Sequence, residues 1–339
     1  MFTKGKSKQE EPNPSASASI SPARRRIRWI GKALVGLVIF LLVLAVAGAI
    51  YQAIATMRAE RAYPAPGEMV DVGSYSLHIN CVGQGSPTVV LDAGLGDFSA
   101  NWVRVQRQVS GTTRVCAYDR AGMGWSEMGP ESRDAKQITS ELHTLLSKAG
   151  IEGPYVLVGH SLGGLSMLTY AARYPEEVAG VTLVDSSTEL NQFSHQPKAR
   201  DSNEPQKQSL AVVPHLAQLG VSLLARLGVV RLLSNLDPAS PELPPHQRAQ
   251  IDALTPSTRQ VSTFAGEFLA PHPVAQTGEP GEQTACGGHC GQIGAQLAQA
   301  AGQTGHSLVQ QHAPCREGGD AHITGVRSER LACDQRGHR

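Results

Sequence analysis

The sequence predicts an α/β fold in which a mostly parallel sheet carries helices on both faces, preceded by one transmembrane helix. Between residues 74 and 187, apolar runs alternate with helical patterns and glycine turns, which is typical of βα units on a parallel sheet. A serine between two glycines follows one of these apolar runs. Residues 33–54 form an uncharged apolar stretch that is long enough to cross a bilayer.

The charges around the apolar stretch predict how it lies in a membrane. Residues 1–32 form a basic arm that we expect to be disordered, because its first part is rich in Ser, Pro, Lys and Glu. Because Lys and Arg are concentrated ahead of the stretch, we expect a single-pass anchor with a cytoplasmic N-terminus, and everything after Met57 outside the cytoplasm. A cleaved signal peptide ending at residues 45–47 is the alternative. A buried core helix is disfavoured, since the stretch has no polar face.

Composition excludes some classes of function. The chain has 339 residues, of which 41% are hydrophobic and 17% charged, as in a globular protein. Its formal net charge of +1 argues against a nucleic-acid partner, which would need a surplus of Lys and Arg on one face. Four of the six cysteines crowd into the last part of the chain, so they predict no evenly spaced disulfide framework and indicate no redox compartment.

The predicted elements follow from periodicity. Apolar residues recur at helical spacing between residues 138 and 149, and a second helix is expected from Leu162 to Tyr174, because Pro175 stops it. The predicted strands are short apolar runs bounded by turn residues, at residues 74–81, 88–92, 113–118, 155–159 and 181–184.

The glycine-flanked serine lies where a predicted strand meets a predicted helix. Residues 159–163 read GHSLG, which fits the G-x-S-x-G nucleophile elbow. In such an elbow the serine sits on a strained turn, so small residues must flank it to let strand and helix approach. We therefore expect Ser161 to be a nucleophile and the Leu162 N–H to stabilise an oxyanion at the helix N-terminus. An ordinary turn with a serine is the alternative.

Two further motifs stand in order before the elbow. Residues 92–96 read DAGLG after a strand, and residues 118–126 read YDRAGMGWS after the next. With the elbow, they make residues 65–190 resemble the α/β-hydrolase superfamily, especially esterase-like members with a cap. The resemblance implies that the Leu95 N–H is the second oxyanion donor, although Ala93 replaces the usual histidine of that loop. It also implies that the second motif is a scaffold turn that frames the pocket.

The resemblance also implies the chemistry. A serine at the elbow favours ester, thioester or amide hydrolysis, whereas the epoxide hydrolases and haloalkane dehalogenases of the superfamily carry aspartate there. Asp185, which ends the strand at residues 181–184, is the expected acid of the triad; a loop-ordering aspartate is the alternative. His160 precedes the serine and is expected to line the pocket or pack rather than to act as base. No metal and no organic cofactor is implied.

The rest of the chain divides unevenly. A hydrolase core at residues 65–187 is followed by residues 188–270, where polar linkers and an apolar stretch at residues 210–233 resemble a helical cap, whose apolar face would cover the acyl pocket or lean on the membrane. Residues 271–339 form a tail of different composition. All 16 aromatic residues lie before it, although half of the twelve histidines lie within it, and no run of four apolar residues in it reads as a strand.

The tail therefore does not read as the end of a hydrolase. The superfamily should supply two more strands and a catalytic histidine here, so we interpret the tail as a low-order segment created by a frameshift near residue 270, or by truncation of the enzyme. His322 is the in-frame candidate for the histidine, but no predicted strand leads into it. Residues 286–290 read CGGHC, and without a second ligand pair they predict no metal site.

The leading functional hypothesis is a serine hydrolase of small esters or lipids that works through an acyl-enzyme and is inactive in this form if the histidine is lost. A catalytically dead hydrolase-fold protein, acting as a binding module, is the second hypothesis. A cofactor-free haloperoxidase or C–C hydrolase is the third, because it would use the same triad with different pocket contents.

Overall fold

A computed structural model describes residues 22–130, 133–186, 212–234, 243–270, 299 and 308–311. The chain divides into two units, Met1–Ala47 and Gly48–Arg339. The described part of the first unit is helical and belongs to α1 (Pro22–Ala62), which continues without a break into the second unit. The second unit contains the sheet and the remaining helices.

Helix α1 is longer than the predicted span in both directions. It starts at Pro22, so the assignment of residues 22–32 to a disordered arm is corrected: this part of the basic arm is helical. From Trp29 to Ala62 the helix is long and apolar enough to cross a membrane, and its most apolar window is fully exposed. The chain thus has one N-terminal helix with the length and composition of a membrane anchor.

The described strands form one sheet in the order β1-β2-β4-β3-β5-β6-β7. Neighbouring pairs among the four central strands are parallel, and β1, β2 and β7 pair antiparallel at the two edges. All five predicted strands are present within a few residues of their predicted bounds, whereas β1 was not predicted, because its exposed EMVD sequence has no apolar run. The bounds are β1 Glu68–Asp71, β2 Ser76–Val82, β3 Thr88–Asp92, β4 Val115–Tyr118, β5 Tyr155–His160, β6 Val178–Val184 and β7 Leu308–Gln311.

Strand β7 corrects one expectation about the tail. The prediction that no strand follows residue 271 is wrong for Leu308–Gln311, which pairs antiparallel with β6, placing Leu308 opposite Val184. An edge strand is held by main-chain hydrogen bonds, so the sequence LVQQ needs no run of four apolar side chains. His322, residues 286–290 and the rest of the tail, apart from residue 299, lie outside the described residues, and the frameshift stays a prediction.

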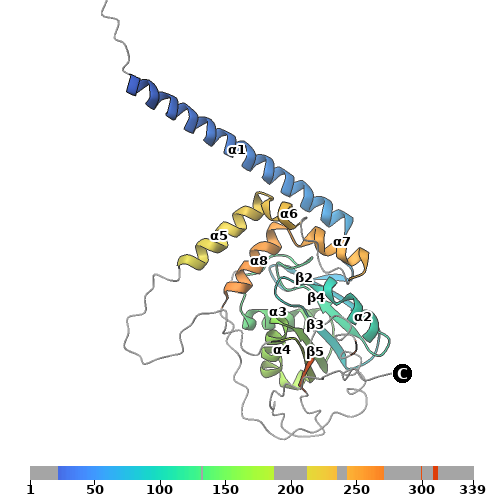
Figure 1. Ribbon diagram of the computed structural model, residues 1–339. Coiled ribbons are helices and arrows are strands. Elements are labelled where there is room, and N and C mark those ends of the chain that lie inside the picture. Colours follow the sequence, from blue (N-terminus) through green and yellow to red (C-terminus); the bar gives the residue numbers. More distant parts are fainter. Residues whose placement is uncertain are drawn as a thin grey trace, which may run out of the picture. The chain divides into compact units, whose positions relative to one another are not determined.

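Helices cover both faces of the sheet (Figure 1). Alternate residues of β3 explain how: Val90 packs in one apolar cluster with leucines of α3 (Ala135–Lys148), whereas Val89 and Leu91 pack in another with Val105 of α2 (Val103–Val109). Helix α4 (Leu162–Arg173) joins α3 on its face. Because both faces are covered, β3 is buried along its whole length. Two short 3₁₀ helices, η1 (Ser99–Trp102) and η2 (Pro175–Glu177), complete this region.

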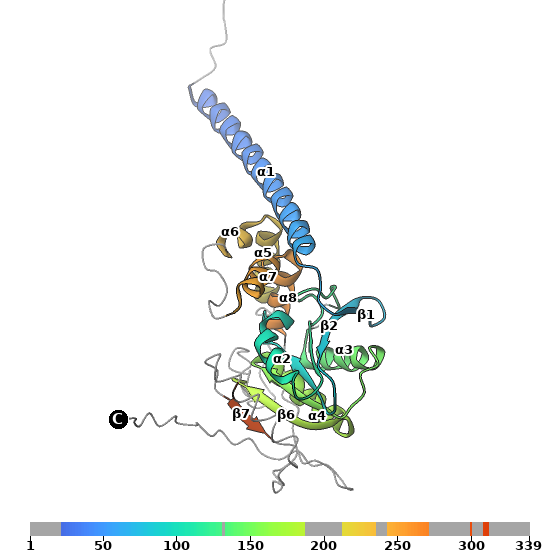
Figure 2. The ribbon, with the colours of Figure 1, turned by 90° about the vertical axis from the view of Figure 1, so that its right-hand side faces the viewer.

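The described part of residues 188–270 is helical, as the resemblance implied. Figure 2 shows these helices gathered at one end of the sheet. Helix α7 packs on the loop after β3, where Ile251 and Leu254 share an apolar cluster with Phe98. The four helices are α5 Val212–Arg226, α6 Val229–Ser234, α7 Pro245–Leu254 and α8 Thr258–Leu269, and together they are called the cap below.

A disulfide bond joins Cys81 to Cys116. The two residues lie directly opposite each other on the antiparallel strands β2 and β4, 35 positions apart in the chain. Since cysteine spacing does not reveal strand register, the sequence did not predict this pair.

Candidate active site

Ser161 lies at the sharp junction between β5 and α4. Its φ of 50° and ψ of −116° place it in a region that non-glycine residues rarely adopt. Among the described non-glycine residues, Asp185 alone shares a positive φ, at 45°. The side chain of Ser161 does not cap α4, although the residue occupies the N-cap position. A backbone strained in this way is a feature of sites where a side chain must be presented for chemistry.

Glycines make this junction possible. A Cβ on Gly159 would lie 2.4 Å from the Cα of Gly164, and a Cβ on Gly163 would lie 2.5 Å from the carbonyl oxygen of Asp92. A Cβ on Gly164 would also collide with Ser186, 2.0 Å from its hydroxyl oxygen. The geometry therefore agrees with the predicted need for small residues on both sides of the serine, and it adds Gly164 as a third such position.

The loop after β3 approaches the same junction. The side chain of Leu95 packs against a buried apolar cluster formed by Ala135, Leu162 and Leu165. The structure thus brings together Leu95 and Leu162, the two residues whose N–H groups were expected to be oxyanion donors. Their proximity follows from packing between the loop and the first turn of α4, which Gly163 permits by its closeness to Asp92.

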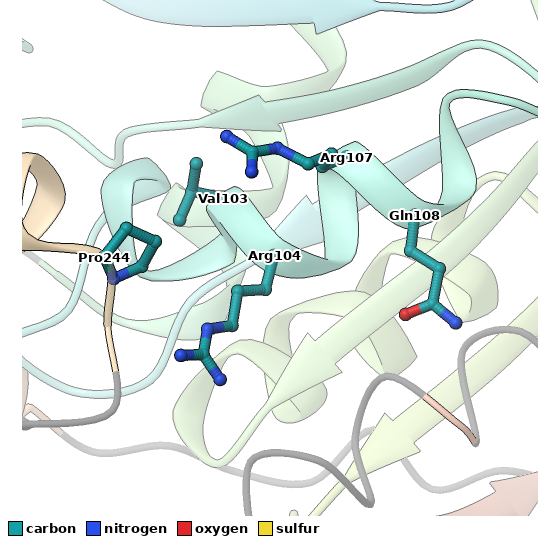
Figure 3. A pocket seen from close by; sticks show the side chains of 5 residues that line it. All are labelled: Val103, Arg104, Arg107, Gln108 and Pro244. Carbon is teal, nitrogen blue, oxygen red and sulfur yellow. The ribbon is translucent and has the colours of Figure 1, made fainter.

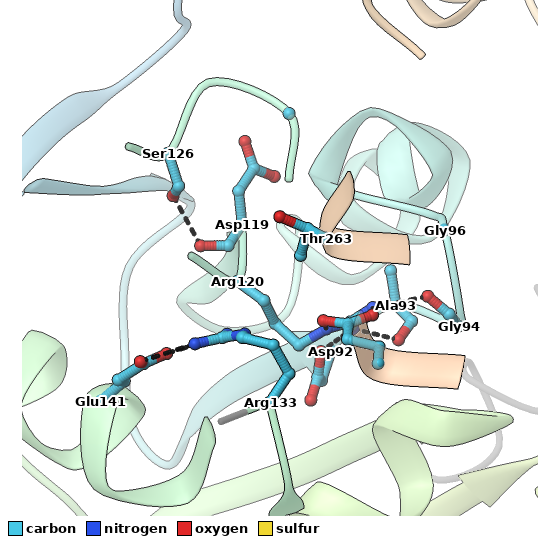
Figure 4. A network of polar contacts seen from close by, with 12 residues as sticks. Asp92, Ala93, Gly94, Gly96, Asp119, Arg120, Ser126, Arg133, Glu141 and Thr263 are labelled. Atoms are coloured by element: carbon cyan, nitrogen blue, oxygen red, sulfur yellow. Dashed lines mark hydrogen bonds and ion pairs between the residues drawn. The ribbon is translucent and has the colours of Figure 1, made fainter. Parts of the chain in front are cut away.

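A buried arginine fixes the shape of this loop. Arg120 is 2% exposed and donates hydrogen bonds to the carbonyl oxygens of Ala93 at 2.5 Å and Gly94 at 2.7 Å. It also forms ion pairs with Asp92 at 2.7 Å and with Glu267 at 2.8 Å (Figure 4). Burial opposes the charge of the guanidinium, but the two carboxylates outweigh that effect, so the pKa of Arg120 lies above its ordinary value.

Glu267 belongs to α8, so the arginine joins the cap to the loop. A second contact comes from Gln260, which donates to the carbonyl oxygen of Gly96 at 3.0 Å and accepts from the Gly124 N–H at 3.1 Å. The ring of Phe264 lies so close to Gly96 that a Cβ there would be 2.9 Å from it. The cap helix α8 therefore contacts the 92–96 loop directly at Gly96 and, through Arg120, is linked to Asp92 and Gly94 as well.

Asp119 organises the turn that follows β4. Its buried carboxylate accepts hydrogen bonds from the main-chain N–H groups of Ser99 and Trp125 and contacts Nδ1 of His78 at 2.9 Å. Burial of His78 disfavours its charged form, yet the hydrogen bond and charge of Asp119 outweigh this, and its pKa lies above the ordinary 6.5. Through Asp119, the turn is tied to η1 at Ser99 and to β2 at His78, in keeping with the scaffold role that the resemblance implied.

Asp185 and His160 lie on either side of the elbow. Asp185 follows β6 and is exposed, and the preceding Val184 accepts a hydrogen bond from the Ser161 N–H at 3.2 Å. Nδ1 of His160 lies 3.9 Å from a carboxylate oxygen of Asp97 and close against Gly94. His160 therefore packs beside the 92–96 loop, and packing was one of the two places expected for it.

Three further histidines are engaged elsewhere. His78 is bound to Asp119, His143 contacts Glu177 at 3.1 Å, and His246 lies edge-on to the ring of Tyr63. The candidate His322 lies outside the described residues. Within the described parts of the chain, no group of three or more His, Cys, Asp or Glu could hold a metal ion.

A pocket of about 330 Å³ lies along α2 (Figure 3). It is lined by Val103, Arg104, Arg107, Gln108 and Pro244, and it includes no residue of the elbow or of the 92–96 loop.

Comparison with known proteins identifies the family. A family model described as "alpha/beta hydrolase fold" matches residues 87–267, which is more than half of the chain. The chain belongs to the α/β-hydrolase family. The matched region contains the elbow, the Arg120 network and Glu267, so the features above lie within the family domain.

Individual relatives match shorter parts of the chain. An "AB hydrolase superfamily protein" of Gibberella zeae is 33% identical over 30% of this chain and 33% of its own length. "Putative carbamate hydrolase RutD" of Cronobacter turicensis is 31% identical over 32% of this chain and 41% of its own. The matches span 17% to 41% of the curated relatives' lengths. Among solved structures, the Cif epoxide hydrolase of Acinetobacter nosocomialis aligns with 65% of this chain and 72% of its own, at 15% identity and a TM-score of 0.49.

The Arg120–Glu267 pair was missed in the sequence, although one signal pointed to it. Glu267 is the one acidic residue of α8 and stands between apolar residues in the segment TFAGEFL. A lone carboxylate among apolar residues indicates a buried partner. That partner is an arginine 147 positions away, in the 118–126 motif, and the two meet only once the chain has folded.

Proposed function

We propose that the protein is a serine hydrolase that cleaves small esters or lipids through an acyl-enzyme. Ser161 is the nucleophile, the main-chain N–H groups of Leu95 and Leu162 are the oxyanion donors, and Asp185 orients the base. The observation that carries the proposal is the strained backbone of Ser161 at the N-terminus of α4, where its side chain does not cap the helix and a developing negative charge would face the positive end of the helix dipole.

The proposed chemistry uses the arrangement as follows. The Ser161 hydroxyl attacks the ester carbonyl and gives its proton to a histidine outside the described residues, for which His322 is the in-frame candidate. The carbonyl oxygen becomes an anion that accepts hydrogen bonds from the two N–H groups. The alcohol leaves with the proton, and water then releases the acid from Ser161. Arg120 contributes by holding the 92–96 loop through Ala93 and Gly94.

Covalent labelling tests the proposal. The full chain is treated with a fluorophosphonate, which reacts only with an activated serine, and the modified peptide is identified by mass spectrometry. We expect a label on Ser161 that is lost in Ser161→Ala and kept in Ser147→Ala, which alters an exposed serine of α3. A folded chain that stays unlabelled would contradict the proposal and support the catalytically dead binding module.

The third hypothesis differs only in substrate. A haloperoxidase or a C–C hydrolase would also label at Ser161, so a substrate panel distinguishes it. Hydrolysis of short-chain and long-chain esters, without activity on halide plus peroxide or on diketones, is the expected result.

We also propose that α1 is a single-pass anchor, with the N-terminus in the cytoplasm and the hydrolase domain outside. The concentration of Lys and Arg before residue 33 supports this orientation. The Cys81–Cys116 disulfide supports it as well, because such bonds persist mainly in oxidising compartments. Protease added to intact cells should digest the hydrolase domain and leave an epitope at the N-terminus protected; the reverse pattern would contradict the orientation.

A further inference from the structure

Helices α5 and α6 expose several large apolar side chains. In α5, Leu216, Leu219 and Leu223 recur at helical spacing along one side, and Leu219 is 66% exposed. In α6, Leu232 and Leu233 are 57% and 60% exposed. Single exposed leucines are ordinary on soluble proteins, but a set of this size on two neighbouring helices marks a surface that is covered by something apolar. These residues, together with Leu224, are called the leucine face.

The turn between α5 and α6 packs directly on α1. A Cβ on Gly48 would lie 2.4 Å from the carbonyl oxygen of Leu227, and a Cβ on Gly228 would lie 3.1 Å from the ring of Tyr51. These contacts all fall within the unit Gly48–Arg339. A bulkier residue than glycine at either place would push the two segments apart, so the close approach is built into the sequence.

Polar contacts lock the same joint. The buried Arg231 of α6 donates to the side chain of Gln52 at 3.0 Å and to the carbonyl oxygen of Ala253 at 3.0 Å. Gln52, which is also buried, donates to the carbonyl oxygen of Pro256 at 2.8 Å. Buried hydrogen bonds of this kind fix geometry, because breaking one leaves a polar group unsatisfied. These hydrogen bonds join the end of α1, at Gln52, to α6 and to the segment from Ala253 to Pro256.

The position of the joint along α1 sets its depth in a membrane. Gly48 and Tyr51 both belong to the apolar stretch at residues 33–54. Gly48 lies six residues before the end of that stretch, which at the helical rise of 1.5 Å per residue is about 9 Å inside its boundary. A segment that packs on Gly48 must lie at the same level, within the outer leaflet rather than in water.

Charge agrees with this placement. Residues 212–234 contain no Asp and no Glu, and their two arginines are Arg226, which is exposed, and Arg231, which is buried in the joint. An apolar surface with a basic and no acidic residue suits the boundary of a bilayer, where acidic side chains would be repelled by anionic headgroups.

We propose that the leucine face of α5 and α6 is immersed in the lipid bilayer beside α1, so that the cap is a second membrane contact. Helix α5 also hydrogen-bonds to α8 through Ser222 and Ser262, and α8 holds the 92–96 loop through Glu267. The bilayer thus covers one side of the cap, and the candidate active site lies on its other side. This inference rests on α1 being a membrane anchor and not on the chemistry of Ser161.

Site-specific photocrosslinking of the full chain tests the proposal. A benzophenone amino acid is placed at Leu219 or at Leu223, and the protein is reconstituted into phosphatidylcholine and phosphatidylglycerol vesicles and illuminated. We expect lipid adducts at both positions by mass spectrometry. Leu41, in the apolar stretch, is the positive control, and Lys136, exposed on α3, is the negative control.

Two results would overturn the proposal. Lipid adducts at Leu41 without adducts at Leu219 and Leu223 would show that the face lies outside the bilayer. Crosslinks from Leu219 to a second copy of the chain would show that the leucine face is a dimer interface instead.

Discussion

The buried side chains of β3 are mostly apolar, whereas most buried side chains of the cap helix α8 are polar. Val89, Val90 and Leu91 are fully buried in β3. In α8, by contrast, Gln260, Thr263 and Glu267 are buried while Phe264 and Phe268 are 41% and 50% exposed. Strand β3 follows the usual rule for a protein in water, and α8 departs from it.

Polar contacts contribute more to holding this part of the cap than they do to the centre of the sheet. Its inner side is held to the 92–96 loop by hydrogen bonds and ion pairs, of which the Arg120–Glu267 pair is the most buried. Its outer side carries the exposed leucines of α5 and α6, which the proposal above places in lipid rather than in water. A polar interior with an apolar exterior is the arrangement expected where lipid replaces water around a protein.

Replacing Arg120 should cause the largest loss of stability. In Arg120→Met, Asp92 and Glu267 remain buried without their cation, so we expect a loss of about 3–5 kcal/mol in unfolding free energy. Thermal unfolding in detergent micelles measures this loss. Arg107→Met, which alters an exposed arginine of α2, is the matched control and should unfold close to the wild type. Equal unfolding temperatures for all three proteins would refute a structural role for the buried pair.

A methyl group at Gly163 should act on catalysis more than on folding. In Gly163→Ala the new Cβ meets the carbonyl oxygen of Asp92 at 2.5 Å and displaces the 92–96 loop. A displacement near 1 Å costs about a hundredfold in rate, so fluorophosphonate labelling of Ser161 should slow by that factor. Gly180→Ala is the control, because a Cβ there has no atom within 4 Å. If both variants label alike, the loop does not shape the site.

Titration should distinguish the two regions by their response to pH. The pKa of His78 is raised by Asp119, so its stabilising effect is complete below about pH 6.5 and is lost as pH rises through the higher folded pKa. The difference in unfolding temperature between wild type and His78→Gln should therefore shrink from pH 5.5 to pH 8.5. The difference for Arg120→Met should instead grow with pH, because burial already raises the pKa of Asp92 and, without Arg120, this carboxyl avoids the cost of a buried charge only by protonation at low pH. A His78 difference that grows with pH would contradict the assigned direction.

The leucine face should give the smallest effect on stability. In Leu219→Ala no packing against the described protein is lost, so unfolding in detergent micelles should change by less than about 0.5 kcal/mol. Leu254→Ala, which removes a buried side chain from α7 of the same cap, should cost about 2–5 kcal/mol. If the two variants lose stability equally, the leucine face is packed against protein and not against lipid.

The sequence by itself determined the elements that depend on local pattern. Hydrophobic periodicity predicts the central strands, the helix after Ser161 and the apolar helix before the domain. Glycines add to this where only a small residue fits. The motif at residues 159–163 likewise indicated where strand and helix would meet. The turn needs small residues two positions before and after the serine, and these glycines can be read directly from the sequence.

Tertiary structure alone decided the contacts between distant segments. The pairing of Arg120 with Glu267 across 147 positions, and of Cys81 with Cys116 across 35, depends on register and packing that no local pattern encodes. The leucine face is the same kind of result: α5 reads as an apolar helix, but only its packing on α8, and that of the turn after it on α1, reveals which side remains exposed.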